Sequence, residues 1–414
     1  MVKNYLHRET CRLCTSRDVI NVFSLAPTPL ANAFVTADKL GLEQERYPLD
    51  IWFCNGCGHL QLLDVVDPAV LYEHYVYVSG TSPVFVEHFK DYADYLIESF
   101  HPAPGGLVVD IGSNDGTLLR FFKDGGRRVL GVDPAQEISE ATQASGIPVI
   151  VDYFSPKLAD RIRAEHGAAS IIAANNVIAH IDDLRAVMEG VRRLLAPDGV
   201  FVFEVSYLGA VVENTLFDTI YHEHVDYHSV KPLVGFFDQC DLELIEAIRV
   251  DTHGGSLRGV VQIKGGPRKT GGSVSAILAQ EEAAGLDKPE TFAAFAEHID
   301  GLRTELAGLL RKLKAEGKCI AGFGAPAKLT TLMYHFGLEA ELIDFVIDDS
   351  PLKRGHFTPG MHIPVVPAQA LYERKPDYVV ILAWNFAQPI MAKHTAYREA
   401  GGRFIIPLPK VEVI

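Results

Sequence analysis

Four consecutive polar residues, Tyr221 to His224, are the strongest candidates for chemistry in this sequence. Histidine has an unperturbed pKa near neutrality, where a general base works best. We therefore expect His224 to act as a base, with Glu223 or Glu204 orienting it or sharing a hydrogen bond with the substrate. Tyr221 could donate a hydrogen bond to an enolate oxygen, as carbanion chemistry requires. The run predicts removal of a proton from carbon.

Other side chains could act beside this run. His180 is a second candidate base, while Tyr75 and Tyr77 join two domains and could close over the site. Tyrosines at a domain junction are also common packing residues because their rings are large and apolar. Two histidines separated by one residue could likewise simply line a polar loop. His253 and Gly254 belong to a loop that could contact substrate or be a simple turn.

Polar residues also follow the ends of four predicted strands. The stretch from Asp110 to Gly116 comes first, and its glycines let a ligand approach the backbone closely. Asp133, at the end of the second strand, could accept hydrogen bonds from both ribose hydroxyls of a nucleoside. Asp152 to Phe154 offer a carboxylate and two rings for an adenine, and Asn175 and Asn176 would lie beside a reacting methyl group. The candidate cofactor residues are Asp110, Gly112, Asn114, Asp115, Gly116, Asp133, Asp152, Tyr153, Phe154, Asn175 and Asn176.

Together these residues predict a site for S-adenosylmethionine (SAM) in a class I methyltransferase. A NAD-binding Rossmann domain is disfavoured because the first turn has no G-x-G-x-x-G pattern. The elements that would position the site alternate between strand and helix, which predicts a parallel, doubly wound α/β sheet. We expect strands at 107–111, 128–133, 148–151, 170–174 and 199–204, and helices that begin at Pro83 and Thr117. A further strand near 257–264 and a largely helical stretch at 274–316 follow.

A second, Rossmann-like α/β unit is expected from Lys318, with later strands at 342–347, 378–382 and 403–406. Its first strand leads into Gly322 to Lys328, which fits G-x-G-x-x-A, and an acidic residue lies about twenty positions further on. The pattern alone suggests NAD, but Lys328 adds a cation at a helix start that already favours phosphate, so a nucleotide diphosphate would suit it equally. The candidate substrate-binding residues are Gly322, Gly324, Lys328, Asp348, Trp384, Asn385, His222, Glu204, His253 and Gly254.

The six cysteines include two Cys-x-x-Cys pairs, formed by Cys11 with Cys14 and by Cys54 with Cys57. Two such pairs on strand–turn–strand hairpins are typical of a zinc ribbon, whose four thiolates form a closed tetrahedral site. With no position left for water, this zinc would be structural. The alternative is a redox-sensitive loop with four unliganded cysteines.

Composition limits the class of protein. With 414 residues, 48% hydrophobic and 22% charged, the chain is typical of a globular protein with two or three domains. We expect a zinc-binding domain at 1–75, a SAM domain at 76–247 and a Rossmann-like domain at 248–414. The net charge of −15 disfavours nucleic-acid binding. No signal peptide or membrane span is evident, so we expect a cytoplasmic protein, with a monomer as the working expectation.

Nearly the whole chain resembles the SAM-dependent sugar C-methyltransferases of deoxysugar biosynthesis. The resemblance rests on the two cysteine pairs and on the stretches 110–116, 221–224, 253–255, 322–328, 359–365 and 383–385. It implies that the C-terminal domain helps to hold a nucleotide sugar and that His224 removes the proton beside a keto group. It also implies that Tyr221, Glu223, His180 and either Tyr75 or Tyr77 are active-site neighbours.

The resulting hypothesis is methyl transfer to C-3 of a TDP- or GDP-linked 4-keto-6-deoxy sugar. His222 stands where a family member has an acidic residue, so we expect it to report how this sugar differs. Two alternatives stay open: a NAD-dependent nucleotide-sugar oxidoreductase, and a non-catalytic zinc-ribbon scaffold with a vestigial SAM fold.

Overall fold

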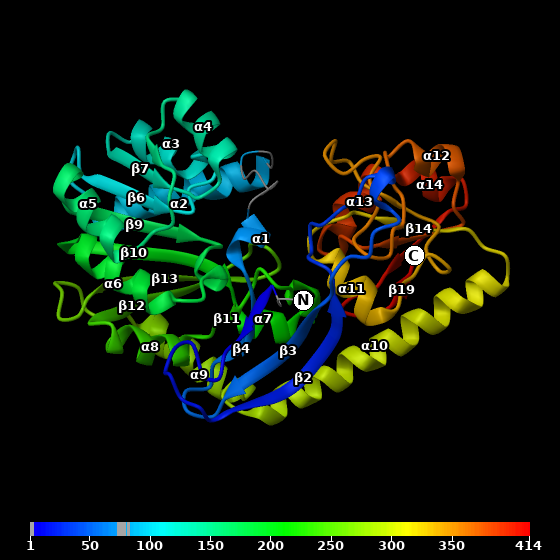
Figure 1. The fold of residues 1–414 in the computed structure, drawn as a ribbon, viewed down its shortest axis with the longest axis horizontal. Helices are drawn as coiled ribbons and strands as arrows, with labels where there is room; N and C mark the ends of the chain where they lie inside the picture. Colours follow the sequence, from blue (N-terminus) through cyan, green and yellow to red (C-terminus); the bar gives the residue numbers. More distant parts are fainter. Residues whose placement is uncertain (1–3, 73–79, 81–82) are drawn as a thin grey trace.

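The computed structural model describes residues 4–72, 80 and 83–414. Figure 1 shows two lobes, one around the central sheet and one around the C-terminal sheet, with the N-terminal strands β2 and β3 and the long helix α10 running beneath both. The central and C-terminal lobes are the expected α/β units. Within the described part of the chain, no helix is long and apolar enough to cross a bilayer.

The N-terminal sheet has the strand order β11-β4-β3-β2. Its strands are β2 (Val19–Thr28), β3 (Tyr47–Cys54), β4 (Leu60–Leu62) and β11 (Asp226–Tyr227), and β1 (Tyr5–His7) pairs with β5 (Asp64–Val66) nearby. β2 continues to Thr28 although Pro27 lies near its end. A register shift between Leu25 and Thr28 leaves Pro27 outside the ladder, and such a bulge is where a strand tolerates proline.

The central sheet has seven strands in the order β12-β13-β10-β9-β6-β7-β8. The predicted strands are β6 (Leu107–Ile111), β7 (Arg128–Val132), β8 (Val149–Ile150), β9 (Ala169–Asn175) and β10 (Leu195–Ser206). Their neighbouring pairs are parallel, which confirms the doubly wound core. β13 (Ser256–Ile263) runs antiparallel to both β10 and β12 (Leu242–Val250). Because β13 is hydrogen-bonded between them, the central sheet continues past the predicted boundary at 247.

Helices cover this sheet, and the first two begin at the predicted Pro83 and Thr117. The helices are α2 (Pro83–Phe100), α3 (Thr117–Asp124), α4 (Gln136–Ala144), α5 (Pro156–His166), α6 (Leu184–Leu194), α7 (Leu208–Glu213) and α8 (Val230–Gln239). Ser155 and Asp183 cap α5 and α6, because each side chain accepts a hydrogen bond from a backbone N–H of the first turn. Two short 3-10 turns, η3 (Ile178–His180) and η4 (Phe217–Thr219), follow strands β9 and β10 and bear on the site.

The C-terminal sheet has the order β16-β15-β14-β17-β18-β19. Its elements are β14 (Ile320–Phe323), α11 (Leu329–Phe336), β15 (Phe345–Ile347), β16 (Val365–Val366), α12 (Ala370–Arg374), β17 (Tyr378–Ile381), η5 (Trp384–Phe386), α13 (Ala387–Lys393), α14 (Thr395–Glu399), β18 (Arg403–Ile406) and β19 (Glu412–Val413). The predicted helical stretch is α9 (Gly272–Ala284) and α10 (Pro289–Ala315). The buried leucines of α10 join one hydrophobic core with strands of the N-terminal and C-terminal sheets, so this helix packs against both.

Candidate active site

The loop after β6 is shaped by glycines. Gly112 and Gly116 have φ values of 71° and 70°, a left-handed conformation that glycine adopts without strain. A Cβ atom on Gly112 would lie 2.4 Å from a methyl carbon of Val177. The Asp133 carboxylate accepts the backbone N–H groups of Asn114 at 2.8 Å and Ala135 at 2.9 Å. Asp133 therefore ties the loops after β6 and β7 together.

Several buried polar atoms around these loops have no hydrogen-bond partner among the described residues. They are Oδ1 of Asp110, Oγ of Ser113 and both amide atoms of Asn175. Burial, and then the charge of Asp133, raises the pKa of Asp110 well above its usual value. Buried polar atoms are costly unless a partner satisfies them. SAM fits this donor and acceptor set, because it carries a positive charge for the carboxylates and ribose hydroxyls and an amino group for the remaining atoms.

The other predicted cofactor residues differ in how accessible their side chains are to a ligand. Tyr153 is 53% exposed and remains available to a ligand, whereas Phe154 is 8% exposed and packs in the core against α5 and α6. The prediction that both rings bracket an adenine is therefore wrong for Phe154. Asp115 is engaged locally, because its Oδ1 accepts from the Thr117 backbone and hydroxyl.

The remaining two are held by backbone hydrogen bonds. Oδ1 of Asp152 accepts the N–H of Tyr153 at 2.9 Å. The N–H of Asn176 donates to the Glu204 carbonyl at 2.8 Å.

His224 has a defined tautomer. Its Nδ1 lies 2.8 Å from the carbonyl oxygen of Thr219, which can only accept, so Nδ1 carries the proton. Its Nε2 therefore keeps a lone pair, and it lies 3.2 Å from the hydroxyl of Tyr221. Burial lowers the pKa of His224 to about 4, so the ring is neutral at pH 7. This is the protonation state that a general base requires.

His180 lies beside this base. The ring centroids of His180 and His224 are 4.9 Å apart, and those of Tyr221 and His224 are 4.3 Å apart with the ring planes tilted by 33°. Burial, and then the nearby His224, lowers the pKa of His180 well below its usual value. All three side chains are only partly buried, so a substrate can reach them. The structure thus brings together three of the predicted catalytic residues.

The other two members of the run point elsewhere. Glu223 is buried, accepts a hydrogen bond from the Asn32 amide at 3.2 Å, and has a pKa raised by burial to about 7. His222 is buried as well, with Nε2 3.2 Å from the Tyr47 carbonyl and its ring edge-on to the Tyr47 ring. In this placement His222 packs against the N-terminal sheet, and its role in sugar recognition stays a prediction.

Glu204 does not orient His224. Its carboxylate accepts from Arg258 Nε at 2.6 Å and pairs with His88 Nε2 at 2.7 Å. Burial alone would raise the pKa of Glu204, but the hydrogen bond of His88 and the charge of Arg258 outweigh it and lower the pKa. His253 contacts the Phe85 ring, with ring centroids 4.5 Å apart and ring planes tilted by 37°, and the neighbouring Gly254 has a φ of 92°. Tyr75 and Tyr77 lie outside the described residues.

The C-terminal loop after β14 contacts the catalytic region directly. Lys328 Nζ lies 3.4 Å from Oδ2 of the buried Asp218, and Trp384 Nε1 donates to the same oxygen at 2.7 Å. Lys328 also lies over the Trp384 ring and is 12% exposed. Both predicted substrate-binding side chains are thus engaged with η4, the turn that presents the Thr219 carbonyl to His224.

Four further predicted substrate-binding residues lie in the C-terminal domain, and packing explains the two glycines among them. A Cβ on Gly322 would lie 2.4 Å from a Leu382 methyl group, and one on Gly324 would lie 2.4 Å from the Ala383 Cβ. Asp348 accepts the N–H of Ala325 at 2.6 Å. In the part of the chain that the structure describes, the buried Oδ1 of Asn385 has no hydrogen-bond partner, which leaves it suited to a polar ligand. Close packing is therefore sufficient to require the two glycines without a dinucleotide.

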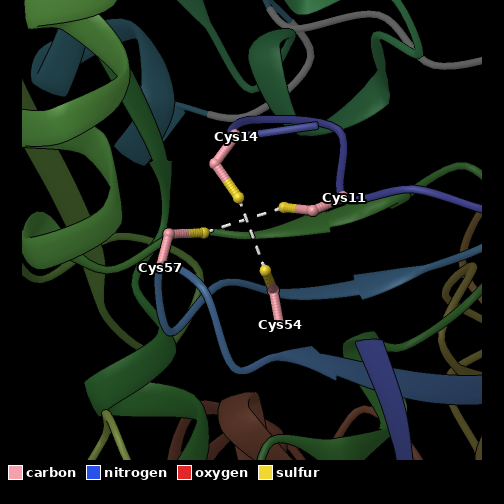
Figure 2. A group of neighbouring side chains, drawn as sticks. All are labelled: Cys11, Cys14, Cys54 and Cys57. Atoms are coloured by element: carbon pink, nitrogen blue, oxygen red, sulfur yellow. Dashed lines mark hydrogen bonds between the residues drawn. The ribbon is translucent and has the colours of Figure 1, made fainter. Parts of the chain in front are cut away.

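The four paired cysteines converge on one point (Figure 2). Their Sγ atoms all lie within 4.8 Å of one another, with Cys11 3.7 Å from Cys57 and Cys14 3.5 Å from Cys54. A tetrahedral zinc with bonds of about 2.3 Å separates its sulfurs by about 3.8 Å, so the arrangement fits zinc. These separations are too long for disulfides, whose sulfurs lie about 2.05 Å apart. Hydrogen bonds from Cys54 and Cys57 lower the pKa of Cys11, which favours a thiolate.

Sequence reasoning missed the residues that hold this region in place. Thr219 contributes a backbone carbonyl, which leaves no signal in residue type. Arg12, Asp182, Asp218 and Asp226 are charged residues whose partners are distant in sequence. The residues around each of them in the sequence do not identify these partners.

Known proteins resemble the chain along its whole length. Three family models match it: a putative zinc binding domain (residues 11–72), a methyltransferase domain (85–247) and a C-methyltransferase C-terminal domain (251–409). The chain is 34% identical to C-methyltransferase NovU of Streptomyces niveus over 98% of its own length and 97% of that protein.

More distant similarities involve parts of the chain. It is 23% identical to the ubiquinone biosynthesis O-methyltransferase of Xanthomonas oryzae pv. oryzae, over 34% of this chain and 64% of that protein. A crystal structure of magnesium protoporphyrin IX methyltransferase from Synechocystis PCC 6803 with bound SAH covers 46% of this chain and 90% of that one, at 14% identity and a TM-score of 0.35. From the full-length similarity and the three matched domains, we conclude that the chain belongs to the family of SAM-dependent C-methyltransferases with an N-terminal zinc-binding domain.

Proposed function

We propose that the protein methylates C-3 of an NDP-4-keto-6-deoxy sugar and that His224 removes the proton beside the ketone. The observation that carries this proposal is the fixed tautomer of His224. Its Nδ1–H donates to the Thr219 carbonyl, so Nε2 keeps its lone pair in a partly exposed position beside Tyr221. A methyltransferase acting on oxygen or nitrogen has less need of such a base, because its acceptor already carries a lone pair.

Tyr221 supplies the complementary hydrogen-bond donor. Its hydroxyl is 3.2 Å from Nε2 of His224 and can donate to that nitrogen when no substrate is bound. A ketone oxygen is the alternative acceptor, and donation to it stabilises the negative charge that develops when the neighbouring carbon loses its proton. When the Tyr221 hydroxyl donates to the ketone oxygen instead of to Nε2, the lone pair of Nε2 can accept that proton. The proton then resides on Nε2, while Nδ1–H continues to donate to Thr219.

Bound SAM supplies the electrophilic methyl group. The residues suited to hold it lie at the carboxyl ends of β6, β7 and β9, next to the turn that carries His180. Both the cofactor loops and the base therefore follow strands of one sheet, and this brings a methyl donor and a deprotonated carbon into one site.

The nucleotide-sugar part of the proposal has separate support. The sequence resembles sugar C-methyltransferases, and the strands β16-β15-β14-β17-β18 of the C-terminal unit follow the 3-2-1-4-5 order of a dinucleotide-binding sheet. Asn385, whose buried Oδ1 has no partner among the described residues, follows the carboxyl end of β17, next to β14 in this sheet. We therefore assign the nucleotide to the C-terminal domain and the sugar to the region of His224.

Incubation with SAM and a panel of TDP- and GDP-linked 4-keto-6-deoxy sugars tests the proposal. Mass spectrometry should show a gain of one methyl group with at least one sugar, and NMR should place it on C-3. Methylation on oxygen or nitrogen, or no methylation of any sugar in the panel, would contradict it. A parallel titration with NADH separates the oxidoreductase alternative, because that enzyme would bind NADH and not SAM.

A further inference from the structure

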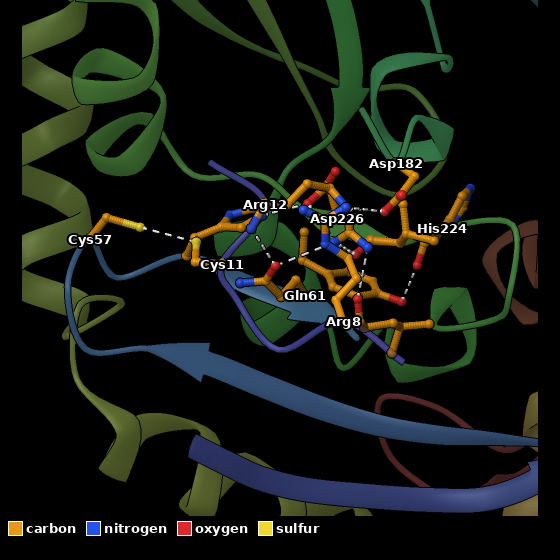
Figure 3. Close-up of polar contacts among 12 residues, drawn as sticks. Arg8, Cys11, Arg12, Cys57, Gln61, Asp182, His224 and Asp226 are labelled. Carbon is orange, nitrogen blue, oxygen red and sulfur yellow. Dashed lines mark hydrogen bonds and ion pairs between the residues drawn. The ribbon is translucent and has the colours of Figure 1, made fainter. Parts of the chain in front are cut away.

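Arg12 lies between the first two zinc ligands, and its side chain is fully buried. Figure 3 shows it reaching away from the cysteines toward the region of His224. A buried guanidinium needs partners for its N–H groups, because an unpaired charge in the protein interior is costly. The partners of Arg12 therefore reveal which segments its position controls.

One set of partners belongs to the segment that carries His224. Arg12 Nη1 donates to the Val225 carbonyl at 3.0 Å and to Oδ1 of Asp226 at 3.3 Å. The hydroxyl of Tyr227 donates to the His224 carbonyl at 2.9 Å. Asp226 and Tyr227 form β11, which pairs with β4 of the N-terminal sheet. The backbone on the C-terminal side of His224 is thus built into the zinc-binding domain.

A second set belongs to the segment that carries His180. Arg12 Nε donates to Oδ1 of Asp182 at 3.1 Å, two residues after His180. The N–H of Val225 also donates to the Ala179 carbonyl at 2.8 Å, so the two histidine-bearing segments are joined directly. One side chain from the zinc knuckle, the segment that carries Cys11 and Cys14, therefore contacts both segments. Each contact lies within three residues of the histidine in that segment.

We propose that Arg12 is a positioning residue that couples the four-cysteine zinc knuckle to the segments carrying His180 and His224. Arg12 acts on the reaction only through backbone and carboxylate contacts and does not touch the reacting atoms. The consequence for catalysis rests on the proposed function, whereas the coupling of the segments does not.

The chain offers a matched control. Arg8 is also an arginine near the zinc knuckle, and its Nη1 donates to the same Asp182 oxygen at 2.9 Å. Its side chain is 23% exposed, and within the described part of the chain it pairs with Asp182 alone. Arg8 therefore shares one contact with Arg12 but lacks the contacts to Val225 and Asp226.

The test compares the wild-type zinc protein with Arg12→Lys and Arg8→Lys. Lysine keeps the positive charge opposite Asp226, so the fold is preserved, but a single ammonium cannot replace the planar fork that reaches two segments at once. The assays measure zinc content, SAM affinity by calorimetry, amide hydrogen exchange in peptides covering 221–228 and 110–116, and turnover with TDP- and GDP-linked 4-keto-6-deoxy sugars.

Arg12→Lys should keep its zinc and SAM affinity, exchange faster in 221–228 but not in 110–116, and lose about 100-fold in kcat with little change in KM. Arg8→Lys should stay within about threefold of wild type. Unchanged exchange in 221–228 overturns the inference, as does a parallel loss of SAM affinity, which would mean that Arg12 serves folding in general. If wild type methylates no sugar, the proposed function fails, and the exchange data still decide the role of Arg12.

Discussion

The loop from Asp110 to Gly116 and the segment from Asp218 to His228 both follow strands of the central sheet, but different contacts hold them. The cofactor loop is tied to its own domain, by Asp133 from the next strand and by close packing of Gly112 on Val177. The base segment is held by the other two domains, with Arg12 on one side and Lys328 and Trp384 on the other.

This difference separates binding of the methyl donor from removal of the proton. A change in the N-terminal or C-terminal domain should disturb the base while the cofactor loop keeps its shape. A change within the central sheet should do the reverse. On the proposed function, the domain that binds zinc would act on the base segment through Arg12, while the described contacts of the cofactor loop come from the central domain.

Removal of zinc should produce the largest difference between the base segment and the cofactor loop, seen as a loss of turnover with little loss of SAM affinity. Metal binding stabilises small zinc domains by about 10 kcal/mol or more, so the knuckle carrying Arg12 should lose its fold without metal. We expect a chelated protein or a Cys57→Ser variant to lose at least about 100-fold in turnover while retaining most of its SAM affinity. Metal analysis, calorimetry and a turnover assay provide the measurements.

The control is Cys240→Ser, which changes a cysteine outside the cluster and should keep zinc and turnover. Full turnover by metal-free protein would show that the knuckle does not control the base. Equal loss of SAM affinity would show that the two ends of the site are not independent.

Asn175→Ala should weaken SAM binding more than it lowers kcat, the opposite of zinc removal. Both amide atoms of Asn175 are buried with no partner within residues 4–72, 80 and 83–414, so a bound cofactor would lose hydrogen bonds worth about 1–3 kcal/mol. We expect SAM to bind about tenfold or more weakly, with smaller changes in kcat at saturating SAM. Calorimetry and steady-state kinetics measure the two effects. Asp160→Asn, on the exposed face of α5, is the control, and unchanged SAM affinity in Asn175→Ala would remove Asn175 from the cofactor site.

Glu223→Gln should have a smaller effect that depends on pH. Burial raises the folded-state pKa of Glu223 to about 7, above the usual value of 4.5. Between these values the folded protein binds a proton that the unfolded chain has released, so wild type loses stability as pH rises from about 4.5 to 7. The variant should therefore be more stable than wild type by about 2–3 kcal/mol at pH 8 and nearly equal to it at pH 4.5. Thermal unfolding at both pH values measures this, and an equal shift at both would refute the raised pKa.

The same comparison explains how much the sequence could predict. The cofactor loop was predictable because its glycines and strand-end acids are adjacent in sequence, and so were the cysteine pairs, whose spacing reflects the geometry of one metal. Phe154 was misplaced because the direction of a ring after a strand depends on packing against α5 and α6.

The contacts that hold the base could not be predicted in this way. Arg12 and Val225 are separated by 213 positions, and Asp218 and Trp384 by 166. Nothing in local spacing links such pairs, and the Thr219 carbonyl is a backbone group that any residue would supply. Glu204 is next to the base region in sequence order but is paired with His88 and Arg258 instead.

Solvent exchange at the carbon beside the ketone tests the central claim most directly. Wild type and His224→Asn are incubated in D2O with the 4-keto sugar and S-adenosylhomocysteine, so that deprotonation is observed without methyl transfer. NMR should show deuterium at C-3 with wild type and a rate at least about 100-fold lower with His224→Asn, whose SAM affinity stays within about threefold of wild type. Exchange at nearly the wild-type rate in folded, SAM-binding His224→Asn would contradict the assignment of His224 as the base.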